Sequence, residues 1–483
     1  MQSVSCPSCG APVEFRSHAS VMAVCGYCQA TVLKEAGAVK DIGKMSAVLE
    51  DFSPIQIGTA GTLGSRGFTV VGRIQLRYSA GMWNEWYLMF DDGSTSWLGD
   101  SSGLYVVTTE RPAQGALPAF TELRPGNSHT IGSEQFTVSE VRTADCIGGQ
   151  GELPFKVGAG WQARVADFRA ASRFLTLDYS DGDTPTVYNG VAVTLEEMKC
   201  QLLRDDDQIK ASAGKYRGKL DALDCPSCGS GIKYLPGVTN HLVCPACSAQ
   251  LDATRPEVEV IAAGKRVEER DFTLALGAKG KINGQDYQVI GAMVRADDEN
   301  TEWTEYLLYN TRSAFFWLVE TPEGWARANV MSTWPDASWI GAPSTSLDKV
   351  KFGKLYDYTA RVVFAAGAFN WRVAAGDRVH VSEFEAGQTK LAAELTEAEL
   401  TWSRSAPVAF DQLKAWFGSE VNPDRAPVVT SKGSSTSTKF LWWLLGLNAI
   451  PLIVNTGGSF MYLLVGALAI YLPAKFLAGD KEK

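Results

Sequence analysis

The sequence predicts a mainly β fold: two cysteine-containing ribbons alternate with two small β-barrel or sandwich domains, each closed by a helix, before a C-terminal transmembrane helical hairpin. Three observations predict it, namely paired C-x-x-C motifs that occur twice, an internal repeat of the β-rich segments, and an apolar tail. The composition, 45% hydrophobic and 20% charged, excludes a disordered chain or a coiled coil. The net charge of −9 argues against nucleic acid as a partner.

Eight of the 10 cysteines form four C-x-x-C pairs, and 15 residues separate the two pairs of each ribbon. This spacing is typical of a four-cysteine zinc ribbon, in which two tight turns present four thiolates to a tetrahedral Zn²⁺. Four thiolates leave no position for a reacting water, so we expect two structural zinc ions that fold segments too small for a core of their own. The predicted ligands are Cys6, Cys9, Cys25, Cys28, Cys225, Cys228, Cys244 and Cys247.

A disulfide framework, a redox C-x-x-C and a catalytic zinc are the alternatives for these cysteines. The N-terminus has neither a basic nor an apolar segment, so no signal peptide and no oxidising compartment are expected. Gly10 and Gly229 follow C-x-x-C motifs and Gly26 lies inside one, where the backbone needs positive φ or close approach to the metal. His18 and His241 stand at different offsets from the cysteines, which predicts loop residues and not ligands.

An internal duplication organises the chain. Cys225 follows Cys6 by 219 positions, and after one inserted residue the offset of 220 pairs Glu85 with Glu305. Repetition therefore predicts alternating small units followed by a tail. Their predicted boundaries are ribbon 1 at 1–35, β domain copy 1 at 55–204, ribbon 2 at 222–252, β domain copy 2 at 271–420, a flexible linker at 423–438 and the transmembrane hairpin at 439–478.

Each β domain shows short segments of β-branched and aromatic residues with turn signals between them, which indicates a barrel or sandwich. Amphipathic helices are expected to close the copies at Leu195–Leu203 and Phe410–Phe417. Trp325 and Trp334 lie in a stretch rich in Gly, Pro and Ser that predicts a loop. The predicted strands include Phe68–Tyr78, Glu85–Phe90, Gln162–Phe168, Phe174–Tyr179, Tyr287–Val294, Glu305–Tyr309 and Arg378–Phe384.

A G-x-x-G motif that opens each β domain, a W-x-E strand and a preceding four-cysteine ribbon together resemble a bacterial family, the domain of unknown function numbered 4178. The resemblance covers Ile57–Lys199 and Leu276–Phe417. It implies a role near the membrane and no chemistry. Since genes of that family often neighbour those of polyamine-synthesis-like enzymes and membrane-stress coat proteins, it also implies a membrane-stress or polyamine-linked system.

The segment Phe440–Leu477 is apolar, and Asn455–Ser459 breaks it near its middle. Two membrane spans in a hairpin fit this pattern; a re-entrant pair, an interfacial segment or a buried hairpin are the alternatives. Lys and Arg flank both ends and the connecting loop carries no charge, so the positive-inside rule places both ends in the cytoplasm. We therefore expect a protein of the bacterial inner membrane with its domains on the cytoplasmic side.

Glu85 and Glu305 recur beside tryptophan and are the best candidates for acid–base chemistry, although a cross-strand polar contact explains them as well. Glu152 is replaced by Ala368 in the second copy. The unmatched Cys146 is expected to be a buried small hydrophobic residue, as is Cys200. The sequence contains no nucleotide-binding or nucleophile-elbow motif.

We therefore predict a non-enzymatic, membrane-anchored adaptor that binds the lipid bilayer and a protein partner. A hydrolase or transferase that uses Glu85 or Glu305, and a nucleic-acid-binding zinc-ribbon protein, are the alternatives. Two domain copies on one tether favour binding, because avidity benefits binding and does little for a single chemical step.

Overall fold

The computed structural model describes residues 2–35, 38–44, 48, 53–78, 81–101, 104–157, 160–205, 208, 223–232, 241–252, 259–262, 272–310, 314–335 and 341–422. The chain divides into Met1–Ala426 and Pro427–Lys483. The predicted linker at 423–438 and hairpin at 439–478 lie outside the described residues. In the described part, no helix is both long and apolar enough to cross a membrane.

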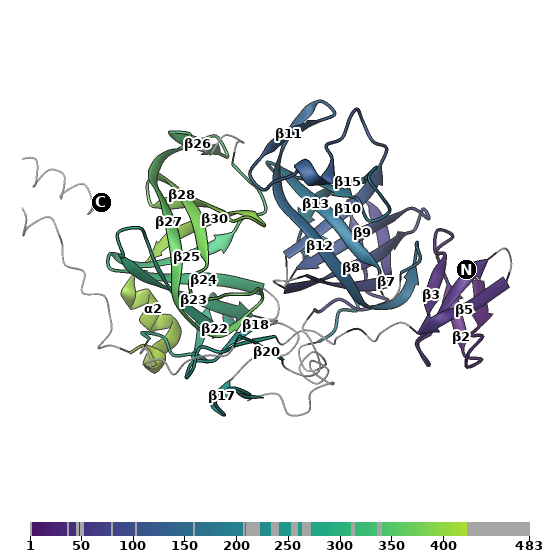
Figure 1. Ribbon diagram of the computed structural model, residues 1–483, viewed down its shortest axis with the longest axis horizontal. Helices are drawn as coiled ribbons and strands as arrows, with labels where there is room; N and C mark the ends of the chain where they lie inside the picture. Colours follow the sequence, from purple (N-terminus) through teal and green to yellow (C-terminus); the bar gives the residue numbers. More distant parts are fainter. Residues whose placement is uncertain are drawn as a thin grey trace, which may run out of the picture. The chain divides into compact units, whose positions relative to one another are not determined.

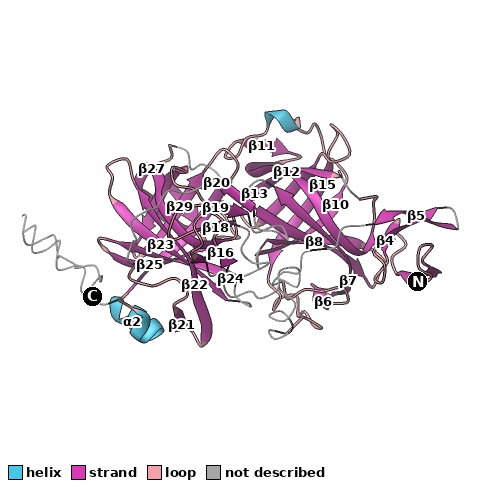
Figure 2. Cartoon of the chain, turned by 60° about the horizontal axis from the view of Figure 1, so that its bottom comes forward, coloured by secondary structure: helices cyan, strands magenta, loops and turns pink. Residues whose placement is uncertain are grey.

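Strands make up most of the described chain, which confirms the mainly β prediction (Figures 1 and 2). In the first copy, eight antiparallel strands form a closed ring, because the last strand of the path pairs back with the first. The strands, in their order around this barrel, are β7 (Arg66–Tyr78), β8 (Gly81–Phe90), β9 (Thr95–Ser101), β10 (Leu104–Arg111), β15 (Thr186–Val193), β14 (Arg173–Asp178), β13 (Gln162–Ala170) and β12 (Glu134–Leu153).

The second copy repeats the same ring of eight strands, closed between β27 and β22. Short hairpin strands accompany each barrel at its edge: β6 (Ala60–Leu63) and β11 (Ser128–Ile131) in the first, β21 (Lys279–Ile282) and β26 (Ser344–Leu347) in the second. The second ring runs β22 (Gln285–Ala296), β23 (Glu302–Asn310), β24 (Ala314–Thr321), β25 (Gly324–Val330), β30 (Leu400–Val408), β29 (Thr389–Leu395), β28 (Arg378–Ala386) and β27 (Val350–Phe369).

Glycine permits the closure of each ring. Gly72 on β7 pairs with Gly151 on β12, and a Cβ at Gly72 would lie 1.8 Å from the carbonyl oxygen of Glu152. Gly151 has a φ of 68°, a conformation that favours glycine. Gly291 and Gly367 form the equivalent pair in the second copy. Two backbones can therefore approach here more closely than side chains would allow.

Each ribbon continues the sheet of the barrel that follows it. In the first ribbon, β3 pairs with the end of β12 through Met22 and Leu153, and in the second, β18 pairs with β27 through Leu242 and Ala368. The ribbon strands are β1 (Gln2–Ser5), β2 (Pro12–Phe15), β3 (Met22–Val24), β4 (Ala30–Glu35) and β5 (Ala38–Lys44), then β16 (Leu223–Asp224), β17 (Gly231–Ile232), β18 (His241–Val243), β19 (Gln250–Asp252) and β20 (Glu259–Ala262).

The predicted closing helix of the second copy is confirmed as α2 (Phe410–Phe417), which buries Leu413 and Phe417 and is followed by the 3-10 turn η2 (Gly418–Glu420). The predicted helix at Leu195–Leu203 is wrong. That segment is a single capped turn, in which the Glu197 N–H donates to the Thr194 hydroxyl, and it ends where Lys199 takes a φ of 47°. Another 3-10 turn, η1 (Phe120–Glu122), lies between β10 and β11.

Successive side chains of a strand face opposite sides of the sheet, so each barrel has an inner and an outer face. The outer face of the second barrel carries Tyr306 and Leu318, which pack with Leu413 and Phe417 of α2. The inner face is identified by a contact that crosses the ring: Arg295 on β22 forms an ion pair with a residue of β29, which is not its neighbour in the sheet. Trp325, predicted in a loop, lies on β25 and is buried.

Candidate metal centres and a buried acidic site

The first ribbon brings its four cysteines together. The sulfurs of Cys6 and Cys28 lie 3.7 Å apart, as do those of Cys9 and Cys25. All four sulfurs lie within 4.8 Å of one another. A Zn–S bond of about 2.3 Å in a tetrahedron requires sulfurs about 3.8 Å apart, and a disulfide requires about 2 Å. These separations therefore fit four ligands around one metal ion and not a disulfide.

The second ribbon repeats this geometry. Its sulfur separations are 3.8 Å between Cys225 and Cys247 and 3.7 Å between Cys228 and Cys244. The cysteine spacing predicts that the four cysteines of each ribbon come together, and both ribbons show such a group. Two four-cysteine groups that could hold metal ions are thus present in the described part of the chain.

Four similar turns position the sulfurs. In each, the residue after the second cysteine has positive φ and donates its N–H to the carbonyl of the first cysteine. Glycine provides this conformation at Gly10 and Gly229, as expected, whereas Gly26 does not have positive φ. The four N–H···O distances are 2.8 Å for Gly10 to Cys6, 3.0 Å for Gln29 to Cys25, 2.8 Å for Gly229 to Cys225 and 2.8 Å for Ser248 to Cys244.

Hydrogen bonds favour the thiolate at one position of each group. A backbone hydrogen bond from Ala30 lowers the pKa of Cys28 to about 7, and hydrogen bonds from Ser230 lower the pKa of Cys228 to about 6. Burial has the opposite effect on Cys244, whose pKa rises to about 12. Since the thiolate is the form that binds a metal, a cation at the centre would be needed to keep all four sulfurs ionised.

Neither histidine near the ribbons belongs to these groups. His18 is exposed in a turn. His241 lies on β18 and not in a loop; it is buried, its Nε2 lies 3.2 Å from the Val373 carbonyl oxygen, and burial lowers its pKa to about 4. Cys146 and Cys200 are partly buried in the barrel cores, and burial raises the pKa of each to about 11.

Glu152, the third carboxylate singled out by the sequence, connects the first ribbon to its barrel. Its side chain is 4% exposed, and one carboxylate oxygen accepts the backbone N–H groups of Arg16 at 2.7 Å and Ser17 at 3.0 Å. Because both hydrogen bonds are donated by backbone N–H groups of the ribbon, this carboxylate has a structural role. The methyl side chain of Ala368, at the equivalent position of the second copy, cannot accept such hydrogen bonds, so the two ribbons are attached differently.

The two tryptophan-linked glutamates occupy equivalent places on the inner faces. The indole Nε1 of Trp83 donates to Glu85 at 2.7 Å, and that of Trp303 donates to Glu305 at 2.7 Å. Each pair lies two residues apart on one strand and therefore on one face of the sheet. The contact shared by both copies is thus between neighbours on the same strand. The expected cross-strand contact is present in the second copy, where Glu305 also meets Arg295 of the adjacent strand.

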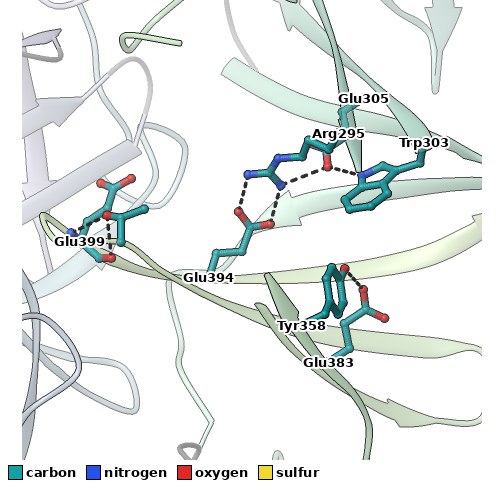
Figure 3. A network of polar contacts seen from close by, with 8 residues as sticks. Arg295, Trp303, Glu305, Tyr358, Glu383, Glu394 and Glu399 are labelled. Carbon is teal, nitrogen blue, oxygen red and sulfur yellow. Dashed lines mark hydrogen bonds and ion pairs between the residues drawn. The ribbon is translucent and has the colours of Figure 1, made fainter. Parts of the chain in front are cut away.

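The second barrel surrounds one guanidinium with two carboxylates (Figure 3). Arg295 Nη1 lies 3.1 Å from Glu305 Oε1, and Arg295 Nη2 lies 3.1 Å from Glu394 Oε2. Burial alone would lower the pKa of Arg295, but the two carboxylates raise it. Close by, the Tyr358 hydroxyl donates to Glu383 at 2.8 Å. Sequence reasoning missed this triad because Glu394 is far from Glu305 along the chain.

The first barrel keeps the carboxylates of this site without the guanidinium. Leu76 stands opposite Trp83 as Arg295 stands opposite Trp303, so leucine occupies the place of the arginine. Asp178 stands opposite Val165 and Thr186, as Glu394 stands opposite Val381 and Thr401, which makes it the counterpart of Glu394.

Electrostatics in the first barrel reflect this difference. Burial raises the pKa of Glu85 to about 8, the Trp83 hydrogen bond opposes the rise, and the charges of Asp167, Asp178 and Asp100 add to it. Burial also raises the pKa of Asp167 and of Asp178. Among the residues that the structure describes, neither Glu85 nor Asp178 forms an ion pair with a lysine, arginine or histidine. The charges that act on Glu85 are therefore carboxylates, whereas Arg142 and Arg169 lower the pKa of Asp167.

Comparison with known proteins adds a family to this geometry. No curated protein and no solved structure matches the chain. The model of one family, described as a domain of unknown function (DUF4178), matches residues 56–195 and again residues 275–410, which correspond to the two barrels. The chain therefore belongs to the DUF4178 family and contains two copies of its domain.

Proposed function

We propose that this protein is a non-enzymatic binding adaptor, folded by zinc and anchored through residues 439–478 to the bacterial inner membrane, with its barrels in the cytoplasm. One observation carries the proposal: each four-cysteine group lies in a ribbon whose strand extends the sheet of a barrel. A metal placed there acts on the fold, since four cysteine ligands leave no position for substrate.

Zinc is the metal that the donor set supports best. Four sulfur ligands in a tetrahedral arrangement select Zn²⁺ or an iron–sulfur centre, and the sulfur separations of 3.7–3.8 Å match one ion with bonds of about 2.3 Å. A single ion in each ribbon would hold the cysteine turns together beside a small apolar cluster, which is built around Phe15 in the first ribbon and Leu242 in the second. We therefore assign two structural zinc ions to the chain.

The duplication supports a binding role. Two barrels on one chain can engage two sites of a partner at once, which raises the overall affinity without any new contact. The apolar segment at 440–477 would confine both barrels to the membrane surface and raise their local concentration there. Protein partners at the cytoplasmic face of the membrane are the expected targets.

The test compares the full chain with a variant that lacks residues 431–483, each recovered with its partners from native cells. We expect the full chain in the membrane fraction with two zinc ions per molecule and a specific set of partner proteins. We expect the shortened chain to keep its zinc and to leave the membrane fraction. A full chain without zinc, or one equally soluble with and without the tail, would overturn the corresponding part of the proposal.

A further inference from the structure

The two barrels differ at one position in a way that points to a ligand. In the second barrel the chain supplies its own cation: the Arg295 guanidinium lies between Glu305 and Glu394, 3.1 Å from each. In the first barrel the carboxylates are retained as Glu85 and Asp178. The cation is not retained, because Leu76 has replaced the arginine.

The residue that faces Glu85 across the neighbouring strand is also smaller than its counterpart. Gly99 stands opposite Glu85, whereas Val319 stands opposite Glu305. A Cβ at Gly99 would lie 3.6 Å from both carboxylate oxygens of Glu85, so the glycine leaves the space that a side chain would fill beside this carboxylate. Both replacements, Arg to Leu and Val to Gly, remove atoms near the glutamate.

The charged groups that act on Glu85 do not supply the missing cation. They are the carboxylates of Asp167, Asp178 and Asp100, and all three raise its pKa. Arg142, on the inner face, pairs with Glu140, acts on Asp167 and lies over the rings of Tyr78 and Trp83, 4.1 and 5.5 Å from their centres. It stands opposite Val165 as Tyr358 stands opposite Val381, so it is the counterpart of Tyr358 and does not take the place of Arg295. Glu85 therefore lies among like charges.

We infer that the inner face of the first barrel binds a ligand that bears a guanidinium or primary ammonium group, between Glu85 and Asp178, in the place that Arg295 occupies in the second barrel. Glu85 would accept a hydrogen bond from the cation in addition to that from Trp83. The inference rests on the binding role proposed above and makes it specific to one barrel and one chemical class.

Ethylguanidinium and butylammonium are suitable probes, titrated calorimetrically into the purified full chain at about pH 8.5, where ionised Glu85 is well populated. We expect saturable binding of one probe per chain. Glu85→Gln should weaken it by at least about tenfold, because a charge-assisted contact is lost. Leu76→Arg should abolish it, because the new guanidinium then fills the site from within. Asp183→Asn, a matched loss of one charge on an exposed turn, should leave it unchanged.

A second variant tests the equivalent site of the other barrel and looks for a gain of binding, which a merely unfolded protein would not show. Arg295→Leu opens the equivalent site of the second barrel and should raise the stoichiometry from one probe to two. Three results would overturn the inference. The wild-type protein could bind neither probe, binding could survive both Glu85→Gln and Leu76→Arg, or Asp183→Asn could weaken binding as much as Glu85→Gln does. None of these outcomes depends on the zinc content or the membrane fraction, so the failure of the proposed function would be seen separately.

Discussion

Arg295 on β22 and Glu394 on β29 meet inside the second barrel, with 3.1 Å between Nη2 and Oε2, although their strands are not neighbours in the sheet. The contact joins two sides of the closed ring. Arg295 is 9% exposed and Glu305 is 9% exposed, so much of this triad is shielded from water. A buried ion pair contributes little over an apolar pair, but breaking it is costly, because a charge is then left without a partner.

We expect Arg295→Ala to destabilise the protein by about 3 kcal/mol, because Glu305 would remain buried without its cation. Urea unfolding followed by tryptophan fluorescence measures this loss. The double variant Arg295→Ala/Glu305→Gln should recover part of it, since the unpaired charge is removed. Equal stability of the single and double variants would show that the buried charge is not the cause.

The two four-cysteine groups lead us to expect two zinc ions per chain. Cys225→Ser should reduce zinc from two ions to one per chain, because the ribbon loses one of four ligands. Elemental analysis of the purified protein, together with proteolysis of the ribbon segment, checks this result. Cys200→Ser is the matched control, since Cys200 belongs to neither group and should leave both ions in place.

Glu85 predicts a pH dependence of stability. Its pKa is about 8 in the folded protein against 4.5 as the ordinary value, so the folded state holds a proton that the unfolded state has lost. The free energy of unfolding should therefore fall as the pH rises from about 4.5 to about 8 and level off above that. The expected loss is on the order of 2 kcal/mol, because the side chain keeps some contact with solvent and the effect is smaller than for a fully buried group.

The comparison with Glu85→Gln between about pH 6 and 9 isolates this effect from acid release of the metal. The variant should lack the part of the slope that Glu85 contributes. Identical slopes in the two proteins would mean that the folded state does not raise the pKa of Glu85.

The hydrogen bonds of Glu152 are expected to stabilise the contact between the first ribbon and its barrel. Glu152→Ala leaves the N–H groups of Arg16 and Ser17 without their acceptor and should cost about 1–3 kcal/mol. Glu152→Gln keeps one oxygen as acceptor and should cost less. Amide hydrogen exchange at Arg16 and Ser17 is the measurement, and unchanged exchange in Glu152→Ala would contradict the assigned role.

Local features of this fold could be predicted from the sequence. The β-branched and apolar residues at 68–78 and 287–294 predict the strands found there, and the cysteine spacing predicts the turns that bring four sulfurs together. The helix expected at 195–203 has a suitable apolar pattern, but a capped turn and the positive φ of Lys199 end it after one turn. Amphipathic periodicity over so short a segment does not decide between a helix and a turn.

Long-range pairings could not be predicted in the same way. Closure of the ring depends on β7 meeting β12 at Gly72 and Gly151, whose close approach no local pattern indicates. The acidic site likewise depends on Glu85 and Asp178 coming together from distant strands. Trp325, expected in a loop from its Gly- and Pro-rich surroundings, is buried on β25, where tertiary packing outweighed local composition.

The pairing of β3 with the end of β12 couples the folding of the first four-cysteine ribbon to that of the barrel beside it. Gly151 also pairs with β7, but among the described residues Glu152 and Leu153 have their strand partners, Ala23 and Met22, in the ribbon. Depriving the ribbon of its ion would leave this length of backbone as a bare sheet edge, the kind of edge on which other chains assemble. Chelation should therefore promote self-association of the protein before the barrel itself unfolds.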